Sequence, residues 1–355
     1  MAKVLMKGNE AIGEAAIRAG CLNYFAYPIT PQSEVAEYLS KRMPEVGGMF
    51  LQGESEVAVG YMLFGASACG ARVFTTSSSP GVSLMSEAIS YIAGSQCPAV
   101  FVNIIRGGPG LGGILPSQAD YFQATKGGGH GDYRLLVMAP ASVQEAVEMV
   151  MLAFPLAEKY RNPVMILGDG LIGQMMEPVE FPDHLRTEPT NKDAWATNGM
   201  DTRNSKKSNL VKSLYLDPKM LNDHNLHLKS KYDQMKREEV RYEAYNADGD
   251  YKILIVSYGT MSRVCRTAID MMKEDGLEIG MIRPQTLFPF PEKAIYDAAV
   301  KESCQKVISI EMSMGQMVED VDRCVKGRRP VEWYGKCGGD VPTPEEVIGV
   351  IKSLL

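Results

Sequence analysis

The first half of the chain alternates short apolar runs with longer segments in which apolar residues recur every three or four positions. Residues 98–105, 134–138 and 163–168 are nearly all apolar, as is typical of strands buried on both faces. A helical period covers residues 141–160, where we expect Pro155 to break the helix. This alternation of strands and helices predicts an α/β fold built on a doubly wound, mostly parallel sheet.

The segment around which this sheet is organised is a predicted helix that begins near Glu56. Apolar residues follow the helical spacing on one side and continue on the other, at Val59, Met62, Leu63 and Ala66 and at Val57, Tyr61 and Phe64. A helix that is apolar on nearly all sides is expected to be buried. Glu56 would then lie in the first turn of a buried helix, where a carboxylate needs a partner.

Two interpretations of Glu56 follow from the residues. Acids in the first helical turn stabilise the helix dipole and cap free amides. Alternatively, a pocket of low dielectric raises the pKa of a glutamate, which can then share a proton with a ring nitrogen near neutral pH. Glu54 is a competing carboxylate, but we expect it to be more exposed because it lies at or before the helix start.

Three polar segments lie where predicted strands end, at residues 27–33, 75–81 and 106–117. Ligands of open parallel sheets bind beyond the carboxyl ends of the strands. In the first segment, Thr30 is expected as the N-cap of a helix and Pro31 as its first residue. These segments are therefore the expected walls of a binding site.

Arg106 ends an apolar strand and is followed by a glycine-rich run, GGPGLGG. An arginine there suits a carboxylate or a phosphate, since its guanidinium offers a bidentate fork. The alternative is an ion pair with a surface acid. The run contains a GxGxxG match, but Pro116 follows in place of a helix, so we do not expect a nucleotide site. Similarly, residues 168–170, Gly-Asp-Gly, are expected to form a turn at a strand end.

The second half begins with a change of pattern. We expect a first domain over residues 1–181, a polar linker with a charged helix over 182–250, and a smaller α/β domain over 251–355. The linker helix is predicted at residues 229–245. The final helix has strong start signals, with Thr343 as cap, Pro344 as the first residue and Glu346 completing a capping box.

Composition narrows the range of functions. The 355 residues are 45% hydrophobic and 23% charged, with a net charge of −6 and no basic stripe, so nucleic acid and anionic membranes are unexpected partners. No apolar run reaches membrane-span length, and the start lacks a signal-peptide core, which favours the cytoplasm. Seven scattered cysteines without a CxxC pair predict reduced thiols and no iron–sulfur cluster. His224 and His227 lack a nearby third ligand, so we expect no metal site.

Three motifs resemble those of a known family: YPITPQSE at residues 27–34, GESEVAVG at 53–60 and RGGPG at 106–110. Together they resemble the alpha subunit of the thiamine-diphosphate-dependent 2-oxoacid:ferredoxin oxidoreductases. Residues 283–289, RPQTLFP, resemble the family's transketolase-C-like domain. The resemblance covers both domains and implies that the first is a thiamine-diphosphate-binding domain of the pyrimidine type.

The resemblance also implies roles for individual residues. Glu56 would contact N1′ of the thiamine aminopyrimidine and promote loss of the C2 proton. Thr30 would bind the substrate carboxylate, and Arg106 would neutralise it. The polar segment at residues 75–81 would line the cofactor pocket through Thr76, Ser77 and Ser79.

The same resemblance implies a multisubunit enzyme. A beta subunit would hold the diphosphate, Mg²⁺ and an iron–sulfur cluster, and gamma and delta subunits would complete a hetero-oligomer. The reaction would convert a 2-oxoacid and coenzyme A to acyl-CoA and CO₂, with two electrons for ferredoxin. The protein supplies orientation and charge for the cofactor's chemistry.

Residues 106–133 look most like the branched-chain (3-methyl-2-oxobutanoate) type, with the 2-oxoglutarate type close behind. A second substrate carboxylate would need another cation, and Lys126 and Arg134 are near in sequence. Two further interpretations stay open. One is the pyrimidine-binding subunit of a lipoamide-linked dehydrogenase or transketolase, against which YPITP argues, and the second is a non-catalytic scaffold subunit.

Overall fold

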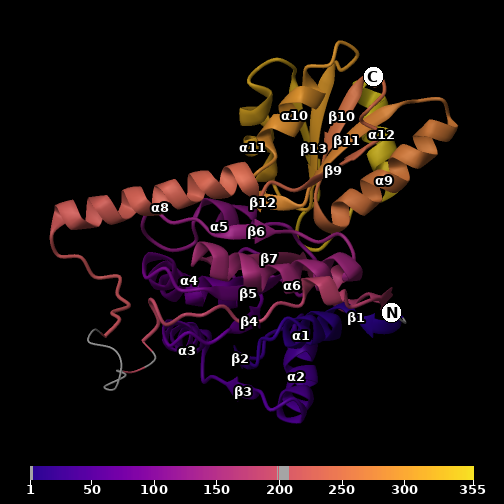
Figure 1. The fold of residues 1–355 in the computed structure, drawn as a ribbon. Helices are drawn as coiled ribbons and strands as arrows, with labels where there is room; N and C mark the ends of the chain where they lie inside the picture. The colour runs from indigo at the N-terminus through magenta and orange to yellow at the C-terminus, as the bar shows by residue number, and fades with distance from the viewer. Residues whose placement is uncertain (1–2, 198, 200–207) are drawn as a thin grey trace.

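The computed structural model describes residues 3–197, 199 and 208–355. A seven-stranded sheet with helices on both faces forms the larger part, and a second α/β unit lies above it (Figure 1). The long helix α8 (Pro218–Glu238) runs along the top of the larger part toward the second unit (Figure 1). No helix within the described ranges is both long and apolar enough to cross a membrane.

The seven-stranded sheet has the order β12-β6-β7-β5-β4-β2-β3. All neighbours are parallel except β12, which comes from the second half of the chain and pairs antiparallel with β6. The strands are β2 (Asn23–Ala26), β3 (Met49–Gln52), β4 (Phe74–Ser77), β5 (Ala99–Ile105), β6 (Leu136–Met138), β7 (Pro163–Asp169) and β12 (Thr286–Phe288). The doubly wound, mostly parallel sheet predicted from the sequence is confirmed.

Helices cover both faces of this sheet. They are α1 (Gly8–Arg18), α2 (Ser33–Glu45), α3 (Glu56–Ala68), α4 (Ser79–Gly94), α5 (Tyr121–Lys126), α6 (Val143–Tyr160) and the short α7 (Gly170–Gln174). The central strand β5 is buried along its whole length and alternates between two cores, because neighbouring strand residues point to opposite faces. Phe101 packs with α3 and α4, whereas Val100 and Val102 pack with α1, α2 and α6.

The second unit contains a five-stranded sheet of order β14-β13-β10-β11-β9, in which only β9 is antiparallel. Its strands are β9 (Tyr242–Tyr245), β10 (Ile253–Val256), β11 (Ile279–Pro284), β13 (Lys306–Glu311) and β14 (Val331–Gly335). Its helices are α9 (Gly259–Glu274), α10 (Glu292–Ala299), α11 (Met317–Val325) and α12 (Pro344–Leu354). One face shares the core that contains α3 and α4, so the two units are joined by packed side chains.

The remaining elements tie the N-terminus to the larger sheet. Strand β1 (Val4–Lys7) pairs antiparallel with β8 (Met176–Val179), and a single 3₁₀ turn, η1 (Asp183–Leu185), follows. The capping box predicted at the last helix is present: Thr343 accepts from the Glu346 amide, and Glu346 accepts from the Thr343 amide. The sequence did not reveal β1, since its four residues lie directly against the helix that follows.

Four local predictions are wrong. Helix α6 continues through Pro155, because buried neighbours such as Met151 and Phe154 hold it against the sheet. The linker helix lies at 218–238, where Asp217 caps it ahead of Pro218, and residues 242–245 form β9. Helix α2 begins at Ser33 with Gln32 at its N-cap position, because Thr30 and Pro31 lie in the turn before it. The fourth concerns α3, which is not buried on all sides: Val57 and Tyr61 are 41% and 38% exposed.

Candidate active site

Glu56 is the first residue of α3 and its side chain is buried, with 6% of the residue exposed. The capping role belongs to Ser55, whose hydroxyl accepts from the Ala58 amide at 3.3 Å. Within the described part of the chain, no hydrogen bond or ion pair reaches the Glu56 carboxylate. Glu54, the competing acid, is exposed. A buried carboxylate without a partner is costly for folding, so its position favours a ligand-binding role over a capping role.

The Glu56 carboxylate lies against the backbone of Gly81 in the first turn of α4. A Cβ atom built on Gly81 would come within 2.6 Å of Glu56 Oε1 and 2.2 Å of Ser77 Oγ. Only glycine fits this position without displacing one of the two groups. The hydroxyls of Ser77 and its neighbour Ser78 are buried and have no hydrogen-bond partner. Polar groups that lack partners therefore gather where β4 ends and α4 begins.

Arg106 follows β5 and is 8% exposed. Its Nη1 and Nη2 donate to the carbonyl oxygens of Thr30 and Leu111, both at 3.1 Å, and its Nε is buried without a partner. No carboxylate of the described residues pairs with Arg106, so the surface ion pair considered from the sequence is wrong. A buried guanidinium held only by carbonyls keeps an uncompensated positive charge, which suits an anionic ligand.

Thr30 lies in the turn between β2 and α2 and its side chain is exposed. Its carbonyl contacts Arg106, and its hydroxyl makes no hydrogen bond within the described chain. Asn9, a fully buried residue of α1, stabilises this turn by donating a hydrogen bond to the Pro31 carbonyl at 2.8 Å. The structure thus brings Thr30 and Arg106 together, and Asn9 is a supporting residue that the sequence pattern did not reveal.

Thr76 and Ser77 are neighbours in β4 and point to opposite faces of the sheet. The Thr76 hydroxyl donates to Gln32 Oε1 and lies 2.7 Å from the Tyr24 hydroxyl, so it belongs to a buried network under α2. The Ser77 hydroxyl lies instead toward Glu56 and Gly81. Of these two predicted site residues, Ser77 joins Glu56 and Thr76 supports the turn that carries Thr30.

Ser79 links the two halves of the site. Its backbone φ of +20° is unusual for a residue with a side chain, and its amide donates to Asn103 Oδ1 at 3.0 Å. Its hydroxyl donates to Asp120 Oδ2 at 2.6 Å and accepts from the Arg106 amide at 3.1 Å. Burial raises the pKa of Asp120, while its bonds to Ser79 and Asn103 oppose that change. The sequence analysis missed Asn103 and Asp120, although an asparagine inside an apolar strand was a visible signal.

The other candidate segments have structural explanations. Asp169 caps α7 by accepting from the amides of Leu171 and Ile172, as expected of a strand-end turn. His224 contacts the Gly94 carbonyl at 2.7 Å and stacks on Tyr215. Among the described residues, no group of three His, Cys, Asp or Glu side chains is placed to hold a metal ion.

Comparisons with known proteins connect this arrangement to a family. Residues 14–244 match the family described as "Pyruvate flavodoxin/ferredoxin oxidoreductase, thiamine diP-bdg", and residues 252–347 match "Pyruvate:ferredoxin oxidoreductase core domain II". The chain belongs to the pyruvate flavodoxin/ferredoxin oxidoreductase family. It is therefore a 2-oxoacid:ferredoxin oxidoreductase subunit with a thiamine-diphosphate-binding domain.

Relatives within the family extend over the full chain. The chain is 47% identical to the ketoisovalerate oxidoreductase subunit VorB of Methanothermobacter marburgensis, covering 100% of this chain and 98% of that protein. It is 35% identical to the 2-oxoglutarate synthase subunit KorA of Methanothermobacter thermautotrophicus, covering 98% of each. The two relatives are named for the two substrate types considered from the sequence, ketoisovalerate and 2-oxoglutarate.

Solved structures support the same assignment. A 2-oxoglutarate:ferredoxin oxidoreductase from Magnetococcus marinus, with 2-oxoglutarate, coenzyme A and succinyl-CoA bound, matches with a TM-score of 0.85 and 27% identity. The match covers 99% of this chain and 65% of that one, so this family member spans about two thirds of that relative's chain. A split-gene transketolase, 14% identical with a TM-score of 0.60, shares the fold alone.

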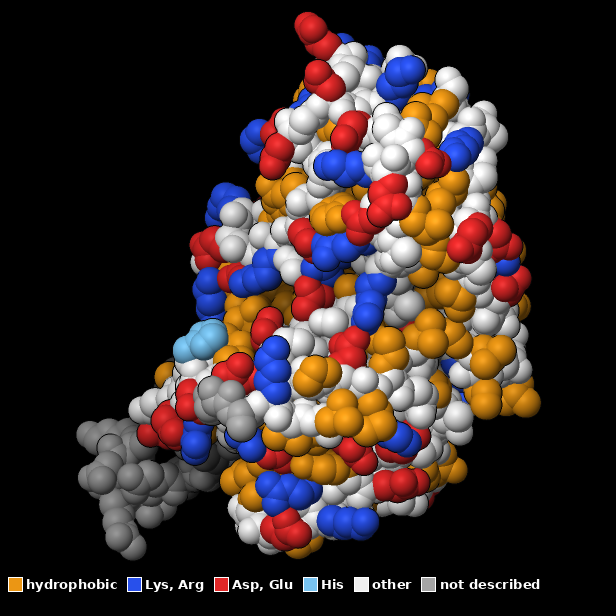
Figure 2. Space-filling view, turned by 90° about the vertical axis from the view of Figure 1, so that its right-hand side faces the viewer, with side chains coloured by type: hydrophobic (Ala, Val, Ile, Leu, Met, Phe, Trp, Pro, Cys, Tyr) orange, Lys and Arg blue, Asp and Glu red, His pale blue; other side chains and the backbone are white. Residues whose placement is uncertain are grey.

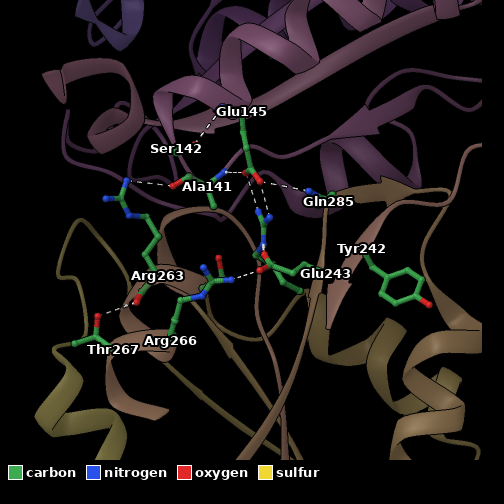
Figure 3. A pocket seen from close by; sticks show the side chains of 11 residues that line it. Ala141, Ser142, Glu145, Tyr242, Glu243, Arg263, Arg266, Thr267 and Gln285 are labelled. Atoms are coloured by element: carbon green, nitrogen blue, oxygen red, sulfur yellow. Dashed lines mark hydrogen bonds and ion pairs between the residues drawn. The ribbon is translucent and has the colours of Figure 1, made fainter. Parts of the chain in front are cut away.

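A cavity of about 600 Å³ in this family member lies away from the site, between α6, α9 and the strands β9 and β11. Figure 3 shows Glu145 and Glu243 directed toward arginines across it. Arg283 donates to Glu145 at 2.8 Å and to Glu243 at 2.8 Å, and Arg266 pairs with Glu243. The third arginine, Arg263, pairs with Glu177 at 2.7 Å. Because these charges neutralise one another, the cavity is better explained as an ionic contact between the two units than as a binding site for an anion.

Proposed function

We propose that this chain is the alpha subunit of a branched-chain 2-oxoacid:ferredoxin oxidoreductase acting on 3-methyl-2-oxobutanoate. The overall reaction would be oxidative decarboxylation with coenzyme A to acyl-CoA and CO₂, with two electrons passed to ferredoxin. The observation that carries the proposal is the buried, unpaired carboxylate of Glu56, which meets the unpaired hydroxyl of Ser77 over Gly81. A purely structural site would not leave these groups without partners.

These residues fit the pyrimidine half of thiamine diphosphate. Glu56 would hold N1′ of the aminopyrimidine and share a proton with it, and the Ser77 and Ser78 hydroxyls are free to bond the same ring system. When bound, the cofactor supplies a carbon nucleophile and an electron sink for decarboxylation. Only 6% of Glu56 is exposed, so this hydrogen bond would act in a medium of lower dielectric than bulk water.

Arg106 would neutralise the carboxylate at the reacting end of the substrate. Its Nε is unpaired, and its two terminal nitrogens are bonded only to neutral carbonyls. The exposed Thr30 hydroxyl lies on the residue whose carbonyl fixes Arg106, which supports a joint role in binding that carboxylate. The chain's contribution here is orientation of the substrate and compensation of its charge.

Two further cations, Lys126 and Arg134, were considered for a second substrate carboxylate, but their contacts favour a substrate with one carboxylate. Lys126 is paired with Asp320 at 2.6 Å, and Arg134 donates to the carbonyl of Tyr133 at 3.0 Å. No hydrogen bond within the described chain connects either of them with Glu56, Thr30 or Arg106. The higher identity to the ketoisovalerate subunit points the same way. The second candidate, 2-oxoglutarate, rests on the KorA relatives and the solved relative.

We propose that partner subunits complete the enzyme. Val57 and Tyr61 on α3, with Leu84 on α4, leave an exposed apolar surface directly outside the helix that carries Glu56. A beta subunit covering this surface would hold the diphosphate, Mg²⁺ and an iron–sulfur cluster, since the described residues of this chain offer no group of three His, Cys, Asp or Glu side chains that could hold a metal ion. Gamma and delta subunits, ferredoxin as acceptor and a cytoplasmic location complete the proposal. On the face drawn in Figure 2, acidic and basic side chains are interspersed among hydrophobic patches.

The test is a substrate panel on the complex purified after co-expression with its partner subunits. With coenzyme A and a viologen acceptor, and no lipoamide, we expect a kcat/KM for 3-methyl-2-oxobutanoate at least about 10-fold above that for 2-oxoglutarate. A preference for 2-oxoglutarate would overturn the substrate assignment. Activity only with a lipoyl acceptor would identify a lipoamide-linked dehydrogenase instead, and full activity of Glu56→Ala would leave only a scaffold role.

A further inference from the structure

The strained residue Ser79 is held by two polar side chains whose role the proposed chemistry does not explain. Asn103 is fully buried in the centre of β5, where every other residue is apolar. Asp120 stands just before α5, and burial raises its pKa. Buried polar groups in a parallel sheet cost stability unless they are bonded, so their presence at this point requires a reason.

The bonds among these three residues form a closed set. Ser79 donates its amide to Asn103 Oδ1 at 3.0 Å and its hydroxyl to Asp120 Oδ2 at 2.6 Å. Asn103 closes the triangle by donating from Nδ2 to the same Asp120 oxygen at 2.9 Å. Two side chains therefore hold the amide and the hydroxyl of Ser79, whose φ of +20° a residue with a Cβ rarely adopts.

Ser79 is connected in turn to both halves of the site. Its hydroxyl oxygen accepts from the backbone amide of Arg106 at 3.1 Å, which fixes the start of the loop that carries the guanidinium. Two residues further on, Gly81 lies against the Glu56 carboxylate. A change in the backbone at Ser79 would displace Arg106 relative to Glu56, the two groups that must act on one bound molecule.

We propose that Asn103 and Asp120 are positioning residues that hold Ser79 in its strained conformation and thereby set the geometry between Glu56 and Arg106. They touch neither cofactor nor substrate in this proposal. Their effect is transmitted through the Ser79 backbone and hydroxyl alone. The inference rests on the proposed function, since it assigns these residues to the same site.

The hydrogen-bond geometry predicts how individual substitutions differ. In Asp120→Asn, one amide oxygen can still accept from both Ser79 and Asn103, because both donors reach the same Asp120 oxygen. In Asp120→Leu the acceptor is lost with little change of size. At position 79, glycine adopts the native φ without strain, whereas alanine keeps the strain and loses its support. Ser79→Gly should therefore be the more active of the two, although it removes more atoms.

The matched control is Tyr121→Phe. Tyr121 is adjacent to Asp120 and donates to the Asp320 carboxylate at 2.6 Å, the same length as the bond from Ser79 to Asp120. It has no hydrogen bond with Ser79, Asn103 or Arg106. This variant removes a comparable buried hydrogen bond from the same region, so it reports the effect of lost stability alone.

The experiment measures kcat, KM for the 2-oxoacid and melting temperature for the co-purified complex. We expect Asp120→Leu and Ser79→Ala to lower kcat/KM about 10- to 100-fold, with Asp120→Asn close to wild type and Ser79→Gly above Ser79→Ala. Tyr121→Phe should lower the melting temperature of the complex at least as much as Asp120→Leu and Ser79→Ala do, but should leave kcat and KM unchanged.

Two results would overturn the inference: kinetic constants of Asp120→Leu and Ser79→Ala equal to wild type, or equal losses in Tyr121→Phe. If Asp120→Leu does not assemble, Ser79→Ala and Ser79→Gly decide the question by their order. Wild type and Glu56→Gln are measured in the same assay, so that a failure of the proposed function can be distinguished from a failure of the positioning role. Lack of 2-oxoacid oxidation by wild type refutes the proposed function, whereas an active wild type, an inactive Glu56→Gln and an unaffected Asp120→Leu refute only the positioning role.

Discussion

The guanidinium of Arg106 donates to the backbone carbonyl of Thr30 at 3.1 Å, across two strand ends that lie 76 residues apart in sequence. This contact fixes the cation without neutralising it. The Thr30 hydroxyl stays available, because the carbonyl makes the contact with Arg106. Arg106 and Thr30 together therefore offer a positive charge and a hydroxyl group to an anionic ligand.

Replacing Arg106 by lysine should mainly weaken substrate binding. A lysine ammonium lacks the planar fork and cannot hold both carbonyls and a carboxylate in one plane. We expect KM for the 2-oxoacid to rise about 10-fold, with a smaller change in kcat, because part of the charge compensation remains. KM for coenzyme A in the same variant is the internal control. An unchanged KM for the 2-oxoacid would argue against the carboxylate contact.

Replacing Glu56 by glutamine should remove catalysis with little effect on folding. The amide is nearly isosteric but cannot share a proton with a ring nitrogen, so we expect kcat to fall by at least about two orders of magnitude. Glu54→Gln, an exposed change two residues earlier, is the matched control and should keep full activity. The rate of viologen reduction by the assembled complex measures the activity of both variants. Equal rates for the two variants would contradict the role of Glu56.

Gly81→Ala tests the close approach between α3 and α4. The added methyl group would lie 2.2 Å from Ser77 Oγ and 2.6 Å from Glu56 Oε1, so at least one of these groups must move. We expect weaker thiamine diphosphate binding by calorimetry and a loss of activity of about 100-fold. Gly94→Ala, at the other end of the same helix, meets only an ordinary contact of 3.5 Å and should be tolerated. Normal cofactor binding by Gly81→Ala would rule out this arrangement.

Glu158 predicts how stability depends on pH. Burial opposes its charge, but the hydrogen bonds from Arg72 and the ion pair with Lys192 at 2.9 Å lower the pKa of the carboxyl to about 2. Since the folded-state pKa lies below the unfolded value, the stabilisation is present above about pH 4.5 and is lost as the pH falls toward 2. Glu158→Gln leaves the buried Arg72 uncompensated, and we expect a loss of about 3–5 kcal/mol at pH 7.

Urea denaturation at pH 7 and pH 3.5 measures this effect. The difference in unfolding free energy between the two pH values should be smaller in Glu158→Gln than in wild type. Glu148→Gln, an exposed change on the same helix, should behave as wild type. A variant that keeps the full pH dependence of wild type would show that other carboxylates account for it.

The sequence alone determined which stretches of residues 23–168 form strands of the larger sheet, because fully apolar runs and helical spacing are local properties of the chain. It did not predict β12, which reaches this sheet from the second half of the chain. It did indicate Glu56, Thr30 and Arg106 as candidate site residues, which stay a prediction, because each lies in or next to a polar segment between a predicted strand and the element that follows it. The motifs were sufficient to suggest the family that the comparisons then established.

Tertiary structure decided what those local patterns could not. The side of α3 that carries Val57 and Tyr61 is apolar in sequence, which predicted burial, but these two residues are 41% and 38% exposed in the folded chain. The separate roles of Thr76 and Ser77 follow from the alternation of strand faces once the sheet is placed. The triangle of Ser79, Asn103 and Asp120 joins three segments distant in sequence. Such contacts depend on which strands become neighbours, and hydrophobic periodicity does not encode that choice.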